Sequence, residues 1–331
     1  MTDILETKKT DNFRNILKFD KGFCEFCQQF ESGTGGHAYI LDCNDKILYD
    51  DLLLSCAVKI LGCTRQEETL VFARTHPDVE IFPTESKKRI SADDVKKIIN
   101  SAYTKPTMSN KKVFCVAVNV SSGEVWQNKL LKLLEEPPQN VFLLIAVPNA
   151  EELLPTLRSR CQVIKTGKFN DGVIVQFLNK TKNVATSKAE EIARLALGSV
   201  AKAQYIASNP SYMACVEDVL NIFGNMTSTK NMAQFLPIVA KYKDSYEDFF
   251  EIMENVLFDA ILVKTNALQS LNLFKKTDII KVADNYTTDA LLRAIGFVEQ
   301  AKKQLDNYAS YNIVTDNLLL NILEVRYLCR Q

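Results

Sequence analysis

Residues 128–161, NKLLKLLEEPPQNVFLLIAVPNAEELLPTLRSRC, form the stretch of the chain that decides its fold. Leucines recur at helical spacing from residue 128 to residue 136 and stop before Pro137 and Pro138. Because a residue that precedes proline is pushed out of the α-helical region, we expect the helix to end there. Residues 141–147 are all apolar and too few to cross a membrane, and they predict a strand buried on both faces of a parallel sheet.

The second half of this stretch predicts a short helix and another strand. Asn149 suits the position just before a helix, and the acidic Glu151 and Glu152 suit its first turn, where the helix dipole favours negative charge. An apolar strand is expected at residues 162–164. The stretch therefore predicts the order helix, strand, helix, strand.

The rest of the N-terminal half continues this alternation. Strands are expected at residues 37–41, 79–82 and 113–118, and an apolar helix at residues 52–61. Ser91 and Asp94 have the spacing of a capping box, in which each side chain bonds the other residue's backbone N–H at the start of a helix. After about residue 169 the pattern becomes almost entirely helical, and Asn209-Pro210 suits a hinge or linker.

The composition limits the class and the compartment of the protein. The 331 residues exceed a usual single domain, and 40 basic residues balance 40 acidic ones, which argues against binding nucleic acid or a membrane by bulk charge. The first ten residues, MTDILETKKT, lack the apolar core of a signal peptide. Nine cysteines scattered through apolar segments suit reduced thiols. We therefore expect a cytoplasmic protein with no membrane partner.

Several motifs resemble those of bacterial clamp-loader subunits of the AAA+ class, as found in DNA polymerase III. They are LLKLLEEPP at residues 130–138, the buried strand that follows it, LLPTLRSRC at residues 153–161 and HPD at residues 76–78. The resemblance covers roughly residues 37–165 and implies an α/β AAA+-like parallel-sheet domain at residues 1–168. It also implies a small helical lid at residues 169–209 and an all-α C-terminal oligomerisation domain, or collar, at residues 210–331.

The phosphate-binding loop of an AAA+ ATPase is missing from the sequence. Such a loop, G-x-x-x-x-G-K-[ST], offers bare backbone N–H groups, a lysine for the terminal phosphates and a hydroxyl for magnesium. Residues 42–50, after the first expected strand, are DCNDKILYD, without a glycine, and Lys46 alone does not replace this set. Asp42 and Asp45 would repel a triphosphate. The glycine cluster at residues 32–36 precedes the strand, so we interpret it as a turn.

Other positions that serve the nucleotide in the family also carry unsuitable side chains. The two acids that orient magnesium and activate water correspond to Ala117 and Val118. The strand that should end in a polar sensor of the terminal phosphate ends in Val147. The sensing arginine of the lid, two residues after Ser199, corresponds to Ala201. The resemblance therefore implies a subunit that has the fold of an ATPase but uses no cofactor and does not hydrolyse ATP.

One residue suited to catalysis remains. Arg160, in Ser159-Arg160-Cys161, matches the position at which clamp-loader subunits present an arginine finger to the nucleotide of the next subunit. An arginine supplied in trans neutralises the charge that develops on the transferred phosphoryl group. The alternative is a structural arginine at a helix end, paired with a carboxylate or with capping carbonyls. The motif favours the finger, with Ser159 and Cys161 as its neighbours.

No metal site is expected from the sequence. Many family members hold zinc with four cysteines before the HPD turn, but Cys63 is the single cysteine left in that segment. His76 is interpreted as a turn residue. Cys24 and Cys27 form a lone C-x-x-C without a second pair at metal spacing, so packing or chance is favoured and the role of the pair stays open.

The resemblance and the missing motifs together imply a non-hydrolysing clamp-loader subunit. The chain would not be an enzyme by itself, and ATPase activity is expected only in its partners. Those partners would be the other clamp-loader subunits in a heteropentameric ring, the sliding clamp, and primed DNA reached through the complex. Two alternatives remain: an active AAA+ ATPase subunit with an irregular phosphate loop, and an AAA+-derived scaffold or DNA-binding accessory protein outside the loader.

Overall fold

A computed structural model of the chain describes residues 13–83, 89–118, 123–265 and 276–328. The chain divides into two compact units, one formed by Met1–Asn183 with Gly198–Lys202 and the other by Val184–Leu197 with Ala203–Gln331. Within the described ranges, no helix is both long enough and apolar enough to cross a bilayer.

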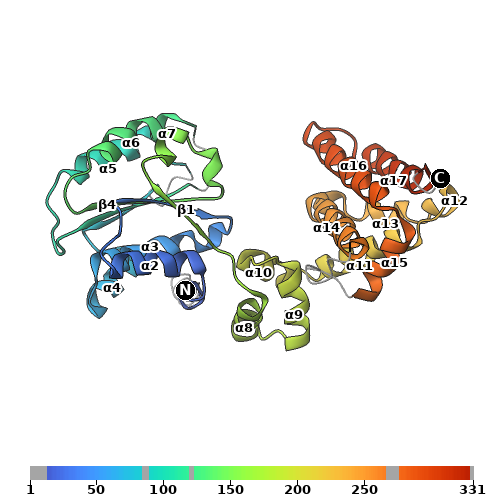
Figure 1. Cartoon of the computed structure of the whole chain (residues 1–331), viewed down its shortest axis with the longest axis horizontal. Helices are drawn as coiled ribbons and strands as arrows, with labels where there is room; N and C mark the ends of the chain where they lie inside the picture. Colours follow the sequence, from blue (N-terminus) through green and yellow to red (C-terminus); the bar gives the residue numbers. More distant parts are fainter. Residues whose placement is uncertain (1–12, 84–88, 119–122, 266–275, 329–331) are drawn as a thin grey trace. The chain divides into compact units, whose positions relative to one another are not determined.

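The first unit contains a five-stranded sheet in which all neighbouring strands are parallel (Figure 1). Its strands are β1 (Ala38–Cys43), β2 (Val79–Phe82), β3 (Lys112–Ala117), β4 (Val141–Val147) and β5 (Gln162–Thr166). Their order across the sheet is β2-β3-β4-β1-β5. The bounds predicted for β2 and β4 are confirmed. β1 ends two residues later than predicted because Asp42 still pairs with Val147, and Cys43 with Thr166.

Helices cover both faces of this sheet. On one face lie α2 (Lys21–Glu31), α3 (Tyr49–Leu61) and α4 (Arg65–Phe72), and on the other lie α5 (Ala92–Ala102), α6 (Val125–Glu135) and α7 (Pro155–Arg158) (Figure 1). Successive side chains of a strand point to opposite faces, so Phe114 and Ile145 belong to the core under α5 and α6. Val95 and Leu130 complete this core from the helices. Burial of each such side chain stabilises the fold by about 1.5–3 kcal/mol.

The two helices that flank β4 show how local sequence sets their ends. α6 begins at Val125, earlier than predicted, because Trp126 lies one turn before Leu130 and extends the buried face. After β4, the Asn149 side chain accepts a hydrogen bond from the N–H of Glu151 (3.0 Å), as predicted for a helix start. The helix is only a 3₁₀ turn, η2 (Ala150–Glu152). α7 then begins separately, because Leu154 precedes proline and stays out of the α region.

The predicted capping box at the start of α5 is confirmed. The hydroxyl of Ser91 accepts a hydrogen bond from the N–H of Asp94 (3.2 Å), and the carboxylate of Asp94 accepts one from the N–H of Ser91 (2.9 Å). These two bonds satisfy N–H groups that a helix N-terminus otherwise leaves without partners.

The HPD turn before β2 organises a distant loop. Asp78 is fully buried, and its carboxylate accepts hydrogen bonds from the N–H groups of Thr107, Met108 and Ser109 at 2.6, 2.7 and 2.8 Å. Burial raises the pKa of this carboxyl, but the backbone hydrogen bonds outweigh burial and lower it. His76 is a turn residue, as predicted, and its Nδ1 accepts from the N–H of Asp78 (3.2 Å).

Two further helices belong wholly or partly to the first unit. α8 (Asp171–Lys182) follows β5, and the first three residues of α10 (Val200–Ser208) return to the first unit after α9 (Thr186–Leu195). Gly198, which precedes α10, has a φ of 86°, and its carbonyl oxygen accepts a hydrogen bond from the N–H of Phe169 (3.0 Å). A side chain at Gly198 would approach the Phe169 carbonyl oxygen at 3.0 Å, so the close approach and the positive φ both favour glycine.

The second unit is helical throughout its described part. Besides α9, it contains α11 (Pro210–Asn225), α12 (Thr229–Met232), α13 (Leu236–Ala240), η3 (Lys243–Ser245), α14 (Tyr246–Lys264), α15 (Lys276–Asn285), α16 (Thr288–Asp306) and α17 (Tyr311–Leu328). The apolar stripe of α14, which includes Phe249, Met253 and Val256, is buried. The division into three parts, with boundaries after residues 168 and 209, stays a prediction.

Candidate functional site

The carboxyl ends of β3, β4 and β1 lie side by side at one edge of the sheet, since these strands are parallel neighbours. In open α/β sheets, ligands bind in the crevice outside these ends. Here β3 ends in Ala117, followed by Val118, and β4 ends in Val147; all three side chains are buried and apolar. None of these side chains binds a cation or activates water.

Acidic residues at the end of β1 and just after it accept hydrogen bonds from the protein's own backbone. The Asp42 carboxylate accepts a hydrogen bond from the N–H of Ala150 (3.3 Å), at the start of η2. The chain then passes through the 3₁₀ turn η1 (Lys46–Leu48) directly into α3. The five residues between β1 and α3, Asn44 to Leu48, contain no glycine.

Asp45, which we expect to repel a triphosphate, also has partners within the protein that the sequence does not reveal. It is 4% exposed, and its carboxylate accepts hydrogen bonds from the Ser199 hydroxyl (2.5 Å) and from the N–H groups of Val200 (2.7 Å) and Ala201 (3.1 Å). These donors form the N-terminus of α10, the kind of site that otherwise attracts a phosphate. Burial raises the pKa of Asp45, and the three hydrogen bonds oppose that effect.

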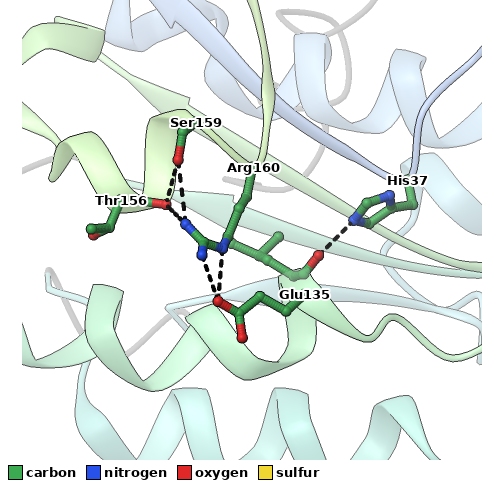
Figure 2. Close-up of polar contacts among 6 residues, drawn as sticks. His37, Glu135, Thr156, Ser159 and Arg160 are labelled. Carbon is green, nitrogen blue, oxygen red and sulfur yellow. Dashed lines mark hydrogen bonds and ion pairs between the residues drawn. The ribbon is translucent and has the colours of Figure 1, made fainter.

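The opposite edge of the sheet carries the second group of polar residues. The amino ends of β4, β1 and β5 meet there, because the three strands are parallel neighbours. Glu135 ends α6 before β4, His37 precedes β1, and Arg160 precedes β5. The fold therefore brings these three residues together from distant parts of the sequence (Figure 2).

Arg160 is held in place by three groups of the same chain. Its Nε and Nη2 donate to one oxygen of Glu135, at 3.0 and 2.5 Å. Its Nη1 donates to the carbonyl of Thr156 (2.8 Å) and to the hydroxyl of Ser159 (3.3 Å) (Figure 2). About a third of the side chain (34%) is exposed, so the guanidinium remains accessible at the surface.

The two motif neighbours of Arg160 have different structural roles. The Ser159 hydroxyl donates to the Thr156 carbonyl (3.1 Å) while it accepts from Arg160, and so completes the turn after α7. Cys161 packs against the apolar core under α6 and α7, and burial raises the pKa of its thiol to about 12. The thiol is therefore protonated at neutral pH and acts in packing.

The described cysteines do not assemble with other ligands. Among the residues that the structure covers, no group of three or more His, Cys, Asp and Glu side chains has a metal-binding arrangement. Cys24 and Cys27 lie on α2, and Cys63 follows α3 as a free thiol. Burial raises the pKa of Cys27 and of Cys63 to about 11.

Two family models match most of the chain. The model described as DNA polymerase III, delta subunit, matches residues 20–170, and the model described as DNA polymerase III, delta subunit, C terminal, matches residues 217–323. The first match covers the sheet, α2 to α7 and Arg160. The second covers most of the helices from α11 to α17.

Two of the relatives are delta' subunits of DNA polymerase III. The chain is 29% identical over 182 residues to DNA polymerase III subunit delta' of Haemophilus influenzae, a match that covers 52% of this chain and 55% of the relative. It is 22% identical over 318 residues to subunit delta' of Escherichia coli, which covers 90% of this chain and 92% of the relative. The chain thus spans little more than half of the first relative and nearly all of the second.

Solved structures align with the chain at low sequence identity. A DNA polymerase III gamma subunit-related protein of Thermotoga maritima is 14% identical with a TM-score of 0.42, over 88% of this chain and 95% of that chain. The Bacillus subtilis clamp loader delta protein is 13% identical with a TM-score of 0.36, over 91% and 99% of the two chains.

The predicted parallel sheet with helices on both faces is confirmed, as is the mostly helical C-terminal region within the described residues. The predicted resemblance to clamp-loader subunits of DNA polymerase III is confirmed by the family models and the relatives. The chain therefore belongs to the DNA polymerase III delta-subunit family, as a clamp-loader subunit of the delta prime-like kind.

Proposed function

We propose that this chain is a non-hydrolysing subunit of a clamp loader, which supports the loading of a sliding clamp onto primed DNA and supplies Arg160 to a neighbouring ATPase subunit. In this role the ATP cycle belongs to the partner subunits. The chain contributes a fixed AAA+-like domain and one cationic side chain, and it acts in the cytoplasm as part of the replication machinery.

The observation that carries the proposal is the binding of Asp45 to the N-terminus of α10. Its buried carboxylate takes the N–H groups of Val200 and Ala201 and the Ser199 hydroxyl, all within 3.1 Å. A nucleotide phosphate at this edge of the sheet would meet a carboxylate already bound to these donors. The apolar ends of β3 and β4 would offer it no metal ligand either.

The position of Arg160 supports its proposed role in a neighbour's site. It precedes β5 at the amino edge of the sheet, opposite the edge where an AAA+ domain would hold its own nucleotide. Its side chain carries a positive charge and is partly exposed. An exposed cation at the edge away from the chain's own degenerate site suits a phosphoryl group held by another subunit.

We further propose that the chain consists of three parts with different roles. Residues 1–168 form the AAA+-like domain, residues 169–209 the lid, and residues 210–331 the collar that joins the subunits in a heteropentameric ring. The family match at residues 217–323 lies within the proposed collar and supports its treatment as a separate part.

The test combines nucleotide binding by the isolated chain with assembly. The full chain is titrated with ATP and magnesium by calorimetry, and it is then mixed with the ATPase subunits of the same loader and analysed by size-exclusion chromatography. We expect no heat of ATP binding and a stable hetero-oligomer. A micromolar dissociation constant, or ATP turnover that Lys46→Ala abolishes, would establish the active ATPase instead. Failure to assemble would favour a protein outside the loader.

A further inference from the structure

The contacts of Arg160 divide its guanidinium into an occupied side and an outer end. A guanidinium carries five N–H donors in a rigid plane. Glu135 takes the side formed by Nε and Nη2 with a single carboxylate oxygen, and Thr156 and Ser159 take Nη1 (Figure 2). Nη2 carries two hydrogens but has one acceptor among the described residues. Because Nη1 has two acceptors and Nη2 has one, the second hydrogen of Nη2 marks the outer end of the group, which is left to meet an external anion.

Glu135 is itself fixed by the end of α6. Nε2 of His37 lies 3.1 Å from the carbonyl oxygen of Leu134, and it bridges the start of β1 to one of the last carbonyls of the helix. The backbone carbonyl of His37 also accepts the N–H of Leu143 in β4 (2.8 Å). Pro137 then ends the helix, so Glu135 lies on a rigid support beside the sheet.

The ion pair also adjusts the charge that a neighbour's nucleotide would meet. Glu135 is 51% exposed and Arg160 is 34% exposed, so the pair adds little to folding stability. The negative charge of Glu135 lies beside the guanidinium of Arg160. It partly offsets the attraction of Arg160 for any phosphate, in the ground state as well as in the transition state. Glu135 also affects the geometry of Arg160, because its two hydrogen bonds fix the plane of the guanidinium.

We propose that Glu135 is a positioning residue for Arg160: it orients the outer end of the guanidinium toward the phosphoryl group held by a neighbouring ATPase subunit and moderates its attraction for unreacted ATP. This inference rests on the proposed function of Arg160. It assigns to the first glutamate of LLKLLEEPP a task that the second does not share. Glu136, the next residue, is exposed and is not among the hydrogen-bond and ion-pair partners of Arg160 in the described part of the chain, so it provides a matched control.

Removal of Glu135 should change kcat and KM for different reasons. Loss of orientation lowers kcat, because a misplaced catalytic group loses much of its effect. Loss of the negative charge strengthens ground-state binding of ATP, which lowers KM. We expect Glu135→Ala to lower kcat about 10-fold and KM for ATP about 3-fold. Glu135→Gln, which keeps an oxygen acceptor but no charge, should lower KM equally and kcat by only about 3-fold.

The experiment measures ATP hydrolysis by the loader reconstituted from this chain and its ATPase subunits, with clamp and primed DNA present. Four variants are compared: Glu135→Ala, Glu135→Gln, Glu136→Gln and Arg160→Ala, each checked for folding by circular dichroism and for assembly by gel filtration. A joint fall of kcat and KM in the two Glu135 variants, absent from Glu136→Gln, supports the proposal.

Two outcomes would overturn it and can be told apart. If Arg160→Ala lowers turnover while both Glu135 variants match Glu136→Gln, the finger stands and the positioning role of Glu135 is wrong. If Arg160→Ala leaves turnover unchanged in an assembled loader, the proposed function of Arg160 fails, and the role of Glu135 fails with it because Glu135 acts through Arg160.

Discussion

The carboxylate of Asp45 accepts a hydrogen bond from the hydroxyl of Ser199, a residue 154 positions further along the chain. This bond ties the turn after β1 to the first turn of α10 within the first compact unit. A protein that binds a nucleotide at this edge places an external phosphate at such a helix terminus. In this chain the anion is an internal side chain, and the helix terminus is satisfied without a ligand.

Asp45→Ala should destabilise the first unit more than Asp45→Asn does. Alanine leaves two buried N–H groups and a hydroxyl without an acceptor, which costs about 2–4 kcal/mol. Asparagine keeps one oxygen acceptor and places no charge in a buried site, so we expect a loss of about 1 kcal/mol or less. Urea unfolding measures both changes. Hydrogen exchange at Val200 and Ala201 should accelerate in Asp45→Ala. Unchanged protection there would show that the carboxylate does not hold α10.

Asp78→Asn should loosen the loop at residues 104–111. The amide offers one oxygen, whereas the carboxylate accepts three backbone N–H groups within 2.8 Å. We expect a loss of about 2–3 kcal/mol and faster proteolysis within this loop. Because the folded-state pKa of Asp78 is lowered, its contribution is present above the ordinary pKa and is lost as the pH falls through the folded-state pKa. A wild-type rate of cleavage in the variant would contradict the role of Asp78.

Asp51 should make stability fall as the pH rises toward neutrality. This residue of α3 is 1% exposed, and burial raises its pKa from 3.8 to about 7, with Asp50 adding to the rise and Arg14 and Arg74 opposing it. The folded state therefore binds a proton that the unfolded state has released between about pH 4 and pH 7, so stability declines across that interval and is level above it.

The corresponding variant is Asp51→Asn, with Asp50→Asn as its control. Asparagine removes the ionisation, so its stability relative to wild type should rise by on the order of 2 kcal/mol between pH 5 and pH 8. Asp50 is half exposed and pairs with Arg74 at 2.5 Å, and its replacement should not produce that rise. Parallel stability profiles for wild type and Asp51→Asn would mean that Asp51 does not titrate in this range.

The sequence predicts those features that depend on neighbouring residues. The run at residues 141–147 gave the bounds of β4, and Ser91 with Asp94 gave the start of α5, because hydrophobic runs and capping boxes are local. The predicted end of β1 is two residues too early, because polar Asp42 is held in the strand by pairing with β4 and β5, and Cys43 by pairing with β5. That pairing becomes visible only in the assembled sheet.

The polar contacts of the candidate site depend on distant residues and were predicted only in part. The missing phosphate loop was visible in residues 42–50, but the partner of Asp45 was not, because it lies across the fold. The sequence held one signal of this partner: the first turn of α10 contains no acidic residue of its own. For Arg160, the sequence left open a structural role in which it pairs with a carboxylate that the sequence does not identify. The structure shows that Arg160 pairs with Glu135, 25 residues earlier.

The central claim is that Arg160 acts on a nucleotide held by another subunit. The direct measurement is the ATP hydrolysis that this chain adds to its assembled partner subunits, compared for wild type, Arg160→Ala and Arg158→Ala. Arg158 is a nearby arginine of similar exposure, paired with Glu151, and its loss should leave that added hydrolysis intact once folding is verified. We predict that Arg160→Ala lowers the added ATP hydrolysis about 100-fold or more, with assembly unchanged. Equal rates for wild type and Arg160→Ala would contradict the account and make Arg160 a structural partner of Glu135.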